Sequence, residues 1–229
     1  MATTTTARRR RTHGTVLYDI SYKTYVRLRS VDANRHLPMI YNDGTMEIIS
    51  PKDMRHERPT VKIGLVVRAV TSELGIAWSS TLGMTFRRAG SGPLKGKGKE
   101  PDESYYIARA RWLGSRESVD LDAGEPPPDL GIEVDHRSSS QGRLPVYAGL
   151  GIPEVWQYRA RKQVLRFLRL VDGAYQSVAR SEALPMLTTT LVLEAMRLGE
   201  GISDLTDMDS DRLIRAWVRE KFLPAAPET

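Results

Sequence analysis

The sequence of 229 residues contains no cysteine, which excludes disulfide bonds, thiolate zinc sites and a cysteine nucleophile. It also contains no run of about 18 apolar residues, the length that a membrane-spanning helix needs. Its N-terminal segment lacks the apolar stretch of a secretory signal. We therefore expect a cytoplasmic protein that makes no membrane contact.

Phenylalanine is scarce as well, with 3 residues against 9 tyrosines, but apolar residues still make up 40% of the chain. That share is enough for a packed core in a chain of this length. We expect a single domain over residues 17–223, preceded by a disordered basic tail at 1–16 and followed by a short tail at 224–229.

Positive charge is concentrated in two segments of the chain. The formal net charge of the chain is +6. The two segments together contribute seven positive charges, from Arg8, Arg9, Arg10, Arg11, Lys95, Lys97 and Lys99, which is more than the whole net charge. Both segments have the composition of flexible chain. Lysine and arginine in such segments attract nucleic-acid phosphates without regard to base sequence, and solvated tails are the alternative interpretation.

Apolar periodicity and turn residues predict alternating helices and strands. Asp-Gly pairs predict two β-hairpins, over 39–49 and 164–178. Helical spacing predicts a long core helix over 55–74, stopped by Gly75. We also expect helices over 21–30, 142–150, 188–198 and 209–222, strands over 76–86, 105–107, 130–134 and 154–158, a loop over 90–99 and a polar connector over 109–128. This order predicts an α/β (α+β) fold, in which a mixed sheet is flanked by helices.

The strand expected at 130–134 carries acids on one face. Leu130, Ile132 and Val134 share a face, whereas Glu133 and Asp135 lie on the other, because successive side chains of a strand alternate. A carboxylate on a central strand is costly unless a cation or hydrogen-bond donors accompany it. The acidic face therefore indicates a functional site, while Asp129, at the start of the strand, is interpreted as a turn acid.

Two further acids can join this face. Glu47 lies on the second strand of the first hairpin, and Asp102 precedes the strand at 105–107. If these strands neighbour the one at 130–134, Glu47, Asp102 and Glu133 converge. Oxygen ligands without cysteine or paired histidines favour Mg²⁺ or Mn²⁺ over zinc.

Several motifs of the chain resemble the Uma-type family of restriction endonucleases, within the PD-(D/E)XK nuclease superfamily. They are Pro101-Asp102, Ile132-Glu133-Val134, residues 143–156 (RLPVYAGLGIPEVW), and residues 44–51 (GTMEIISP) followed by His56-Glu57. The similarity extends from about Tyr18 to Lys221. The resemblance implies the restriction-endonuclease-like αβββαβ core, a mixed sheet flanked by helices.

The same resemblance implies roles for individual residues. Asp102 and Glu133 correspond to ligands of Mg²⁺ or Mn²⁺, and the main-chain carbonyl of Val134 corresponds to a third oxygen ligand. Glu47 corresponds to a further acidic ligand or a partner of the attacking water. His56 and Asp135 are secondary candidates.

The lysine of the superfamily motif is missing from its usual position. It normally lies two residues after the second acid, where this chain has Asp135, and in the Uma-type family it lies on the following helix, where this chain has Arg143. Arginine stays protonated and cannot act as a general base. Arg143 can still hold a scissile phosphate or offset charge in the transition state, so the resemblance implies catalysis that is reduced or changed.

Other polar groups are given structural interpretations. Residues 138–140 form a serine triplet that is typical of a loop or a helix N-cap. Tyr105 and Tyr106 are expected in the core rather than stacked on bases. A carboxylate-pair glycosidase is set aside, because the chain is short and no aromatic sugar platform is evident.

Two functions remain open from the sequence. The first is a metal-dependent endonuclease that hydrolyses phosphodiester bonds of DNA. The second is a catalytically weak or inactive protein of the same fold, which binds nucleic acid or a protein partner without cutting. Related nucleases often pair to cut both strands, so a homodimer is one arrangement that the resemblance allows.

Overall fold

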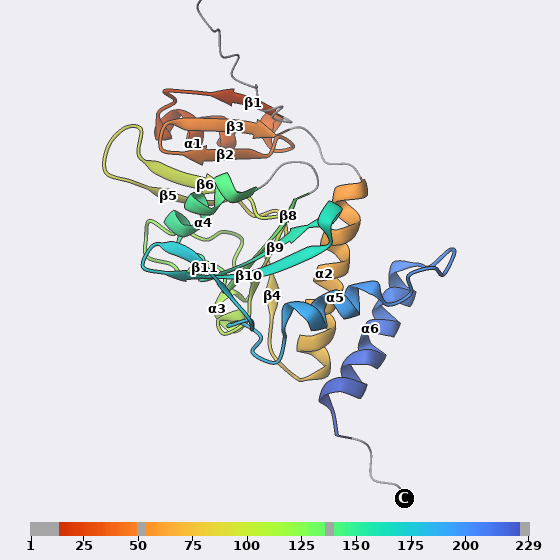
Figure 1. Cartoon of the computed structure of the whole chain (residues 1–229). Helices are drawn as coiled ribbons and strands as arrows, with labels where there is room; N and C mark the ends of the chain where they lie inside the picture. The colour runs from red at the N-terminus through yellow and green to blue at the C-terminus, as the bar shows by residue number, and fades with distance from the viewer. Residues whose placement is uncertain (1–13, 50–53, 136–139, 225–229) are drawn as a thin grey trace, which may run out of the picture.

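Two β-sheets and six α-helices form the protein, in a computed structural model that describes residues 14–49, 54–135 and 140–224 (Figure 1). Sheet A has the strand order β1-β3-β2-β6-β5, and sheet B has the order β11-β10-β9-β8-β7-β4. All strand pairs are antiparallel except β8 and β9, which run parallel and make sheet B mixed. This is a restriction-endonuclease-like fold, as expected.

The strands of sheet A are β1 (Gly14–Leu17), β2 (Met39–Asn42), β3 (Thr45–Ile49), β5 (Phe86–Ala89) and β6 (Gly96–Lys99). The strands of sheet B are β4 (Ser79–Ser80), β7 (Glu103–Tyr106), β8 (Leu130–Asp135), β9 (Glu154–Arg159), β10 (Val164–Val171) and β11 (Ala174–Val178). The α-helices are α1 (Tyr22–Ser30), α2 (Met54–Glu73), α3 (Ala110–Leu113), α4 (Leu144–Leu150), α5 (Thr189–Arg197) and α6 (Asp207–Phe222). Three 3₁₀ turns are η1 (Asp32–Asn34), η2 (Ser140–Arg143) and η3 (Ala160–Lys162).

The elements stack in layers that Figure 1 shows from top to bottom. Helix α1 covers the outer face of sheet A, where Tyr25 and Tyr41 are fully buried. Helix α4 lies between the two sheets, and its Val146 and Leu150 pack with residues of both. Helices α2, α5 and α6 cover the far face of sheet B and enclose the largest core. One face of sheet B therefore meets α2, and the other meets α4 and sheet A.

Local sequence explains the elements that were predicted well. Both hairpins turn on Asp-Gly pairs in which the two residues have positive φ, as in Asp43 (+43°) and Gly44 (+88°). Two such residues match the twist of the strands that they connect. Ser21 caps α1 by accepting a hydrogen bond from the Thr24 amide at 3.1 Å, as expected. The long helix predicted over 55–74 is α2.

Other predictions were wrong. The strand expected over 76–86 is only the short β4, because the chain leaves sheet B there and starts β5 of sheet A at Phe86. The loop expected over 90–99 ends in strand β6, and the connector over 109–128 contains α3. The tail expected over 1–16 overlaps β1, which pairs with β3 from Gly14 onward.

The core contains most of the residues expected in it. Tyr105 and Tyr106 are fully buried, as predicted. On helix α6, Ile214, Trp217, Val218 and Phe222 pack inward, whereas Leu213 is 37% exposed. Within the described ranges, no helix has both the length and the apolar character needed to cross a membrane.

Candidate active site

Glu133 is the centre of a buried ionic cluster between the two sheets. It lies on β8, on the face opposite Leu130, Ile132 and Val134, which pack in the core around α2. Its side chain is 1% exposed. The acidic face that the sequence predicted for this strand is therefore turned toward α4 and sheet A, and not toward solvent.

Three donors hold the carboxylate of Glu133. Lys99 Nζ lies 2.9 Å from Oε2, and the Tyr147 hydroxyl donates to the same oxygen at 2.5 Å. Arg143 donates from Nη1 to Oε1 at 3.1 Å. Burial by itself would raise the pKa of Glu133, but the charges of Lys99 and Arg143 outweigh it and lower this pKa to about 2. The group is therefore a carboxylate at neutral pH.

Lys99 comes from the other sheet. It is the last residue of β6, it is 2% exposed, and its ammonium lies over the ring of Tyr147 at 5.1 Å from the ring centre. The sequence pattern placed it in a flexible, solvated segment, where it would meet phosphates at the surface. The structure instead buries it against Glu133, a contact for which residues 90–99 contain no local signal.

Arg143 joins the two sheets through their acids. It lies at the end of η2, just before α4, with Nη2 at 3.6 Å from Glu47 Oε1 and Nη1 at 3.1 Å from Glu133 Oε1. Burial would lower its pKa, but the carboxylates of Glu133 and Glu47 raise it. Glu47 lies on β3 of sheet A, so one guanidinium bridges both layers.

Asp102 lies beside Glu133 on the neighbouring strand. Strand β7 pairs Glu103 with Ile132, so the next position places Asp102 opposite Glu133 on the same face of sheet B. Asp102 Oδ2 accepts the main-chain N–H of Val134 at 2.7 Å, which fixes the direction of its side chain. The charge of Asp102 also acts on the Tyr147 hydroxyl, whose pKa is raised by burial and by Glu133.

The structure thus brings Glu47, Asp102, Glu133 and Arg143 into one region, but not as a three-acid metal cluster. Arg143 lies between Glu47 and Glu133. In the part of the chain that the structure describes, no three acidic or histidine side chains group closely enough to hold a metal ion. An ion at this site would draw on Asp102 and Glu133 together with main-chain and water oxygens.

The remaining predicted residues have varied positions. Asp135 is buried at the end of β8, where it accepts a hydrogen bond from Gln157 at 3.2 Å. Asp129 accepts main-chain N–H groups of Ile107 and Arg109, in agreement with a structural turn acid. His56 belongs to α2, but its side chain lies outside the described part, as do Arg8, Arg9, Arg10, Arg11, Ser138 and Ser139. The described helix η2 begins at Ser140, the last of the triplet.

The other two lysines of the predicted basic segment differ from Lys99. Lys97 contacts Asn42 Oδ1 at 2.6 Å and Asp43 Oδ2 at 2.7 Å. Lys95 is 61% exposed, with Asp43 at 3.9 Å. Only Lys95 has the exposure that was expected of the segment, and the phosphate contacts of all three stay a prediction.

A further buried acid was not predicted. Glu103 follows Asp102 but faces α2, where its carboxylate accepts hydrogen bonds from Arg68 at 2.7 Å and from the Tyr105 hydroxyl. Burial raises the pKa of Glu103 against the influence of these partners. Alternation along β7 therefore gives Asp102 to the candidate site and Glu103 to the opposite face.

The sequence model of the Uma2 family, described as "Putative restriction endonuclease", matches residues 23–199. The chain belongs to this family. The match covers β2 to α5, and so it includes every described member of the ionic cluster. No curated protein matches the chain. The resemblance read from the motifs is thus confirmed by the match to the Uma2 family.

Proposed function

We propose that this Uma2 protein is a metal-dependent endonuclease that hydrolyses phosphodiester bonds of DNA. The observation that carries the proposal is the buried carboxylate of Glu133, kept ionised between Lys99, Arg143 and Tyr147 and flanked by Asp102. A charged acid in a region of this kind is typical of a catalytic centre.

The donor set suits a hard divalent cation. Asp102 and Glu133 present carboxylate oxygens from facing positions of adjacent strands, and the carbonyl of Val134 would add a third oxygen. Mg²⁺ or Mn²⁺ bound there would supply a Lewis acid for the phosphate and lower the pKa of a bound water. Such an ion would compete with Lys99, Arg143 and Tyr147 for the oxygens of Glu133.

The chain's own cations have distinct tasks in this proposal. Arg143 cannot take up a proton, but its guanidinium can offset the charge of a phosphate that approaches the space between Glu47 and Glu133. Lys99 supplies the ammonium group that the usual motif position, occupied by Asp135, does not. It can donate a hydrogen bond to a non-bridging phosphate oxygen, or to the water that attacks the phosphorus.

The proposal is tested with Glu133→Gln. Supercoiled plasmid, linear duplex and single-stranded DNA are incubated with the wild type and the variant in Mg²⁺, Mn²⁺ or EDTA. We expect cleavage by the wild type with either ion and none in EDTA. The rate of the variant should be lower by a factor of about 10² or more, because the metal ion that acts as Lewis acid on the phosphate loses a carboxylate ligand.

Glu103→Gln is the matched control. It changes a buried glutamate one strand away, on the opposite face of sheet B. Thermal unfolding of both variants separates a loss of catalysis from a loss of folding. Cleavage that Glu133→Gln leaves unchanged would contradict the assignment.

A binding protein without nuclease activity is the second candidate. The saturation of both Glu133 oxygens by groups of the chain itself favours it, because a metal ion must displace one of them. This candidate predicts salt-sensitive DNA binding with no product in either ion, and no product from Arg143→Lys either. Turnover by the wild type would exclude it.

A homodimer belongs to the same proposal. The described chain contributes one ionic cluster of this kind, whereas a double-strand cut requires two cleavage events. Two copies, each with its own cluster, would deliver both cuts in one binding event.

A further inference from the structure

The face of sheet B that carries Glu133 continues across two more strands. In the register of the sheet, Glu133 of β8 lies beside Gln157 of β9, and Gln157 lies beside Arg166 of β10. Neighbouring strands are about 5 Å apart, so the backbone of Arg166 is about 10 Å from that of Glu133. A straight row thus leads from the acidic centre to a guanidinium.

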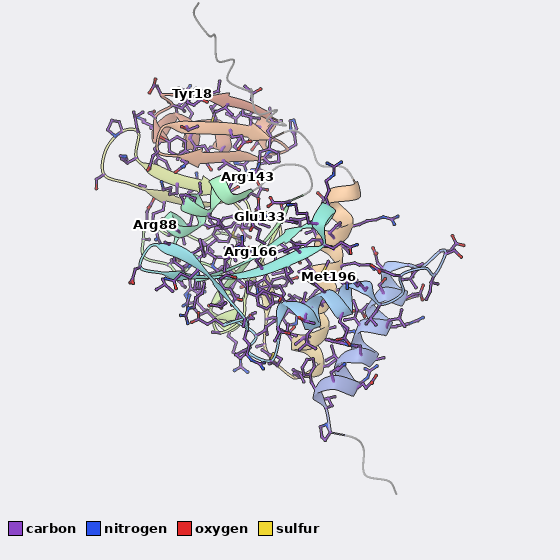
Figure 2. All side chains as sticks on the ribbon, viewed as in Figure 1. Tyr18, Arg88, Glu133, Arg143, Arg166 and Met196 are labelled. Carbon is purple, nitrogen blue, oxygen red and sulfur yellow. The ribbon has the colours of Figure 1, made fainter. Side chains whose placement is uncertain are left out.

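Burial of the neighbouring residues confirms that the row shares one face. On β9, Trp156 and Tyr158 pack in the core around α2, whereas Val155 packs with α4. On β10, Phe167 packs toward α2 and Leu168 toward α4. Alternation therefore turns Gln157 and Arg166 to the side of Glu133. Figure 2 labels Arg143, Glu133 and Arg166 from top to bottom through the middle of the molecule, with Glu133 between the two arginines.

A second arginine lies one step farther along this face. Arg159 ends β9, opposite Asp135 in the parallel register, and its Nε is buried without a hydrogen-bond partner among the described residues. Asp135 is the acid that faces it, and Asp135 also accepts the hydrogen bond from Gln157. On this face of sheet B, the carboxylates of β8 are therefore followed by the guanidinium groups of Arg159 on β9 and Arg166 on β10.

The side chain of the half-buried Arg166 forms no ion pair or hydrogen bond within residues 14–49, 54–135 and 140–224. A guanidinium has five donors in a planar arrangement that matches the oxygens of a phosphate. Helix α4 packs on this face of sheet B near Val155 and Leu168. These two residues are the next ones on the same face along β9 and β10 after Gln157 and Arg166. An anion on Arg166 would thus lie beside the acidic centre and not behind the helix.

We propose that Arg166 and Arg159 bind the phosphodiester backbone of the nucleic acid next to the bond that is cut. The inference rests on the proposed function, because it places the scissile phosphate at Glu133 and the neighbouring phosphates over β9 and β10. Gln157 separates Arg166 from Glu133 without adding a charge, so that the guanidinium of Arg166 is not neutralised by that carboxylate, whereas Arg159 lies opposite Asp135. The two arginines position substrate and take no part in the chemical step.

Strand β10 also offers a matched control. Arg169 is exposed and lies on the opposite face, in register with Glu154. Removing its charge changes the net charge of the protein by the same amount as removing that of Arg166. A difference in DNA binding between Arg166→Ala and Arg169→Ala therefore depends on which face of sheet B carries the arginine, and not on the net charge of the protein.

The test measures binding without cleavage. Fluorescence anisotropy follows a labelled DNA duplex, and the single strand of the same sequence, with the full-length protein in EDTA over a series of NaCl concentrations. We expect Arg166→Ala to weaken binding several-fold at low salt. It should also reduce the slope of log K against log salt by about 0.9 for the duplex or about 0.7 for the single strand. Arg159→Ala should act in the same direction, Arg166→Lys should restore most of the slope, and Arg169→Ala should leave it unchanged.

The outcomes separate the inference from the proposed function. Equal slopes for the wild type, Arg166→Ala and Arg159→Ala would overturn the proposal that the two arginines bind the phosphate backbone, even if the wild type cuts DNA. Loss of slope in Arg166→Ala and Arg169→Ala alike would also overturn it. If Arg166→Ala and Arg159→Ala show the expected loss of slope but the wild type never cuts DNA, the nuclease proposal is contradicted and the phosphate-binding role of the two arginines is supported. Circular dichroism melts of each variant show whether the fold is intact.

Discussion

At the scale of single residues, the site is a set of side chains whose charges depend on one another. Glu133 is ionised because Lys99 and Arg143 accompany it, and both cations can be buried because Glu133 and Glu47 are there. A substitution at any of these positions removes one of the partners of an opposite charge that is largely buried, which costs more than the lost contact alone.

Lys99→Met tests the ammonium that the sequence pattern placed at the surface. We expect the cleavage rate to fall about 10²-fold or more, the range found when a proton-transferring or charge-stabilising group is removed. Methionine keeps most of the apolar volume, so the packing against Tyr147 is largely retained. The measurement is the single-turnover rate with saturating metal ion.

Lys97→Met is the control for this change. It removes a lysine on the same face of β6, whose ammonium contacts Asn42 and Asp43 instead of Glu133. If both variants lose activity equally, Lys99 has no special part in the reaction.

At the scale of elements, the sequence predicts local structure well and the site only in part. The hairpins follow from Asp-Gly turns, and the acidic face of β8 follows from alternation, because both depend on neighbouring residues. The ion pair between Lys99 and Glu133 joins two sheets and two residues that lie 34 positions apart in the sequence (133 − 99 = 34). Such a pairing leaves no trace in composition or spacing.

Strand β6 shows why glycine misled the interpretation. A Cβ atom at Gly98 would lie 2.2 Å from the Tyr25 hydroxyl, and one at Gly96 would lie 2.5 Å from the ring of Tyr22. Glycine is required because these tyrosines of α1 pack directly on the strand. The GKGK pattern therefore reflects close packing of a helix on a sheet, although it is typical of a flexible loop.

Gly98→Ala tests this explanation. The added methyl group must push Tyr25 outward, and we expect a loss of about 1–3 kcal/mol in the free energy of unfolding, measured by urea denaturation. Gly142→Ala is the comparison, because a Cβ atom there meets nothing within 4 Å. A Gly98 variant as stable as the Gly142 variant would show that the packing of Tyr25 does not require glycine.

At the scale of the whole molecule, the ionic cluster connects the layers. Glu47 and Lys99 belong to sheet A, Glu133 belongs to sheet B and Asp102 directly precedes β7 of that sheet, and Arg143 precedes the helix between them. The stability of the assembled molecule should therefore depend on the ionisation of Glu133.

We expect acid to lower the free energy of unfolding by protonating Glu133. The pKa of Glu133 is about 2 in the folded protein against 4.5 as its ordinary value. A depressed pKa contributes stability above pH 4.5, and that contribution is lost as the pH falls from 4.5 toward 2. Urea denaturation of the wild type should show this loss as the pH falls below about 5, through the range of the ordinary carboxyl pKa.

Glu133→Gln removes the titrating group and gives the control. Its free energy of unfolding should lie below that of the wild type at pH 7, and the difference should shrink as the pH falls through the same range. A constant difference between the two proteins would show that Glu133 is not the group responsible.

The passage from Lys99 to Asp102 has a practical consequence for protein engineering. Within these four positions the chain leaves sheet A and enters sheet B, so an ammonium and a carboxylate of one centre are delivered by a single short crossing. A transplant of residues 102–150 into another scaffold would carry Asp102, Glu133 and Arg143 but would not include the ammonium group of Lys99. A working graft must include β5 and β6, with the tyrosine-bearing helix that seats them.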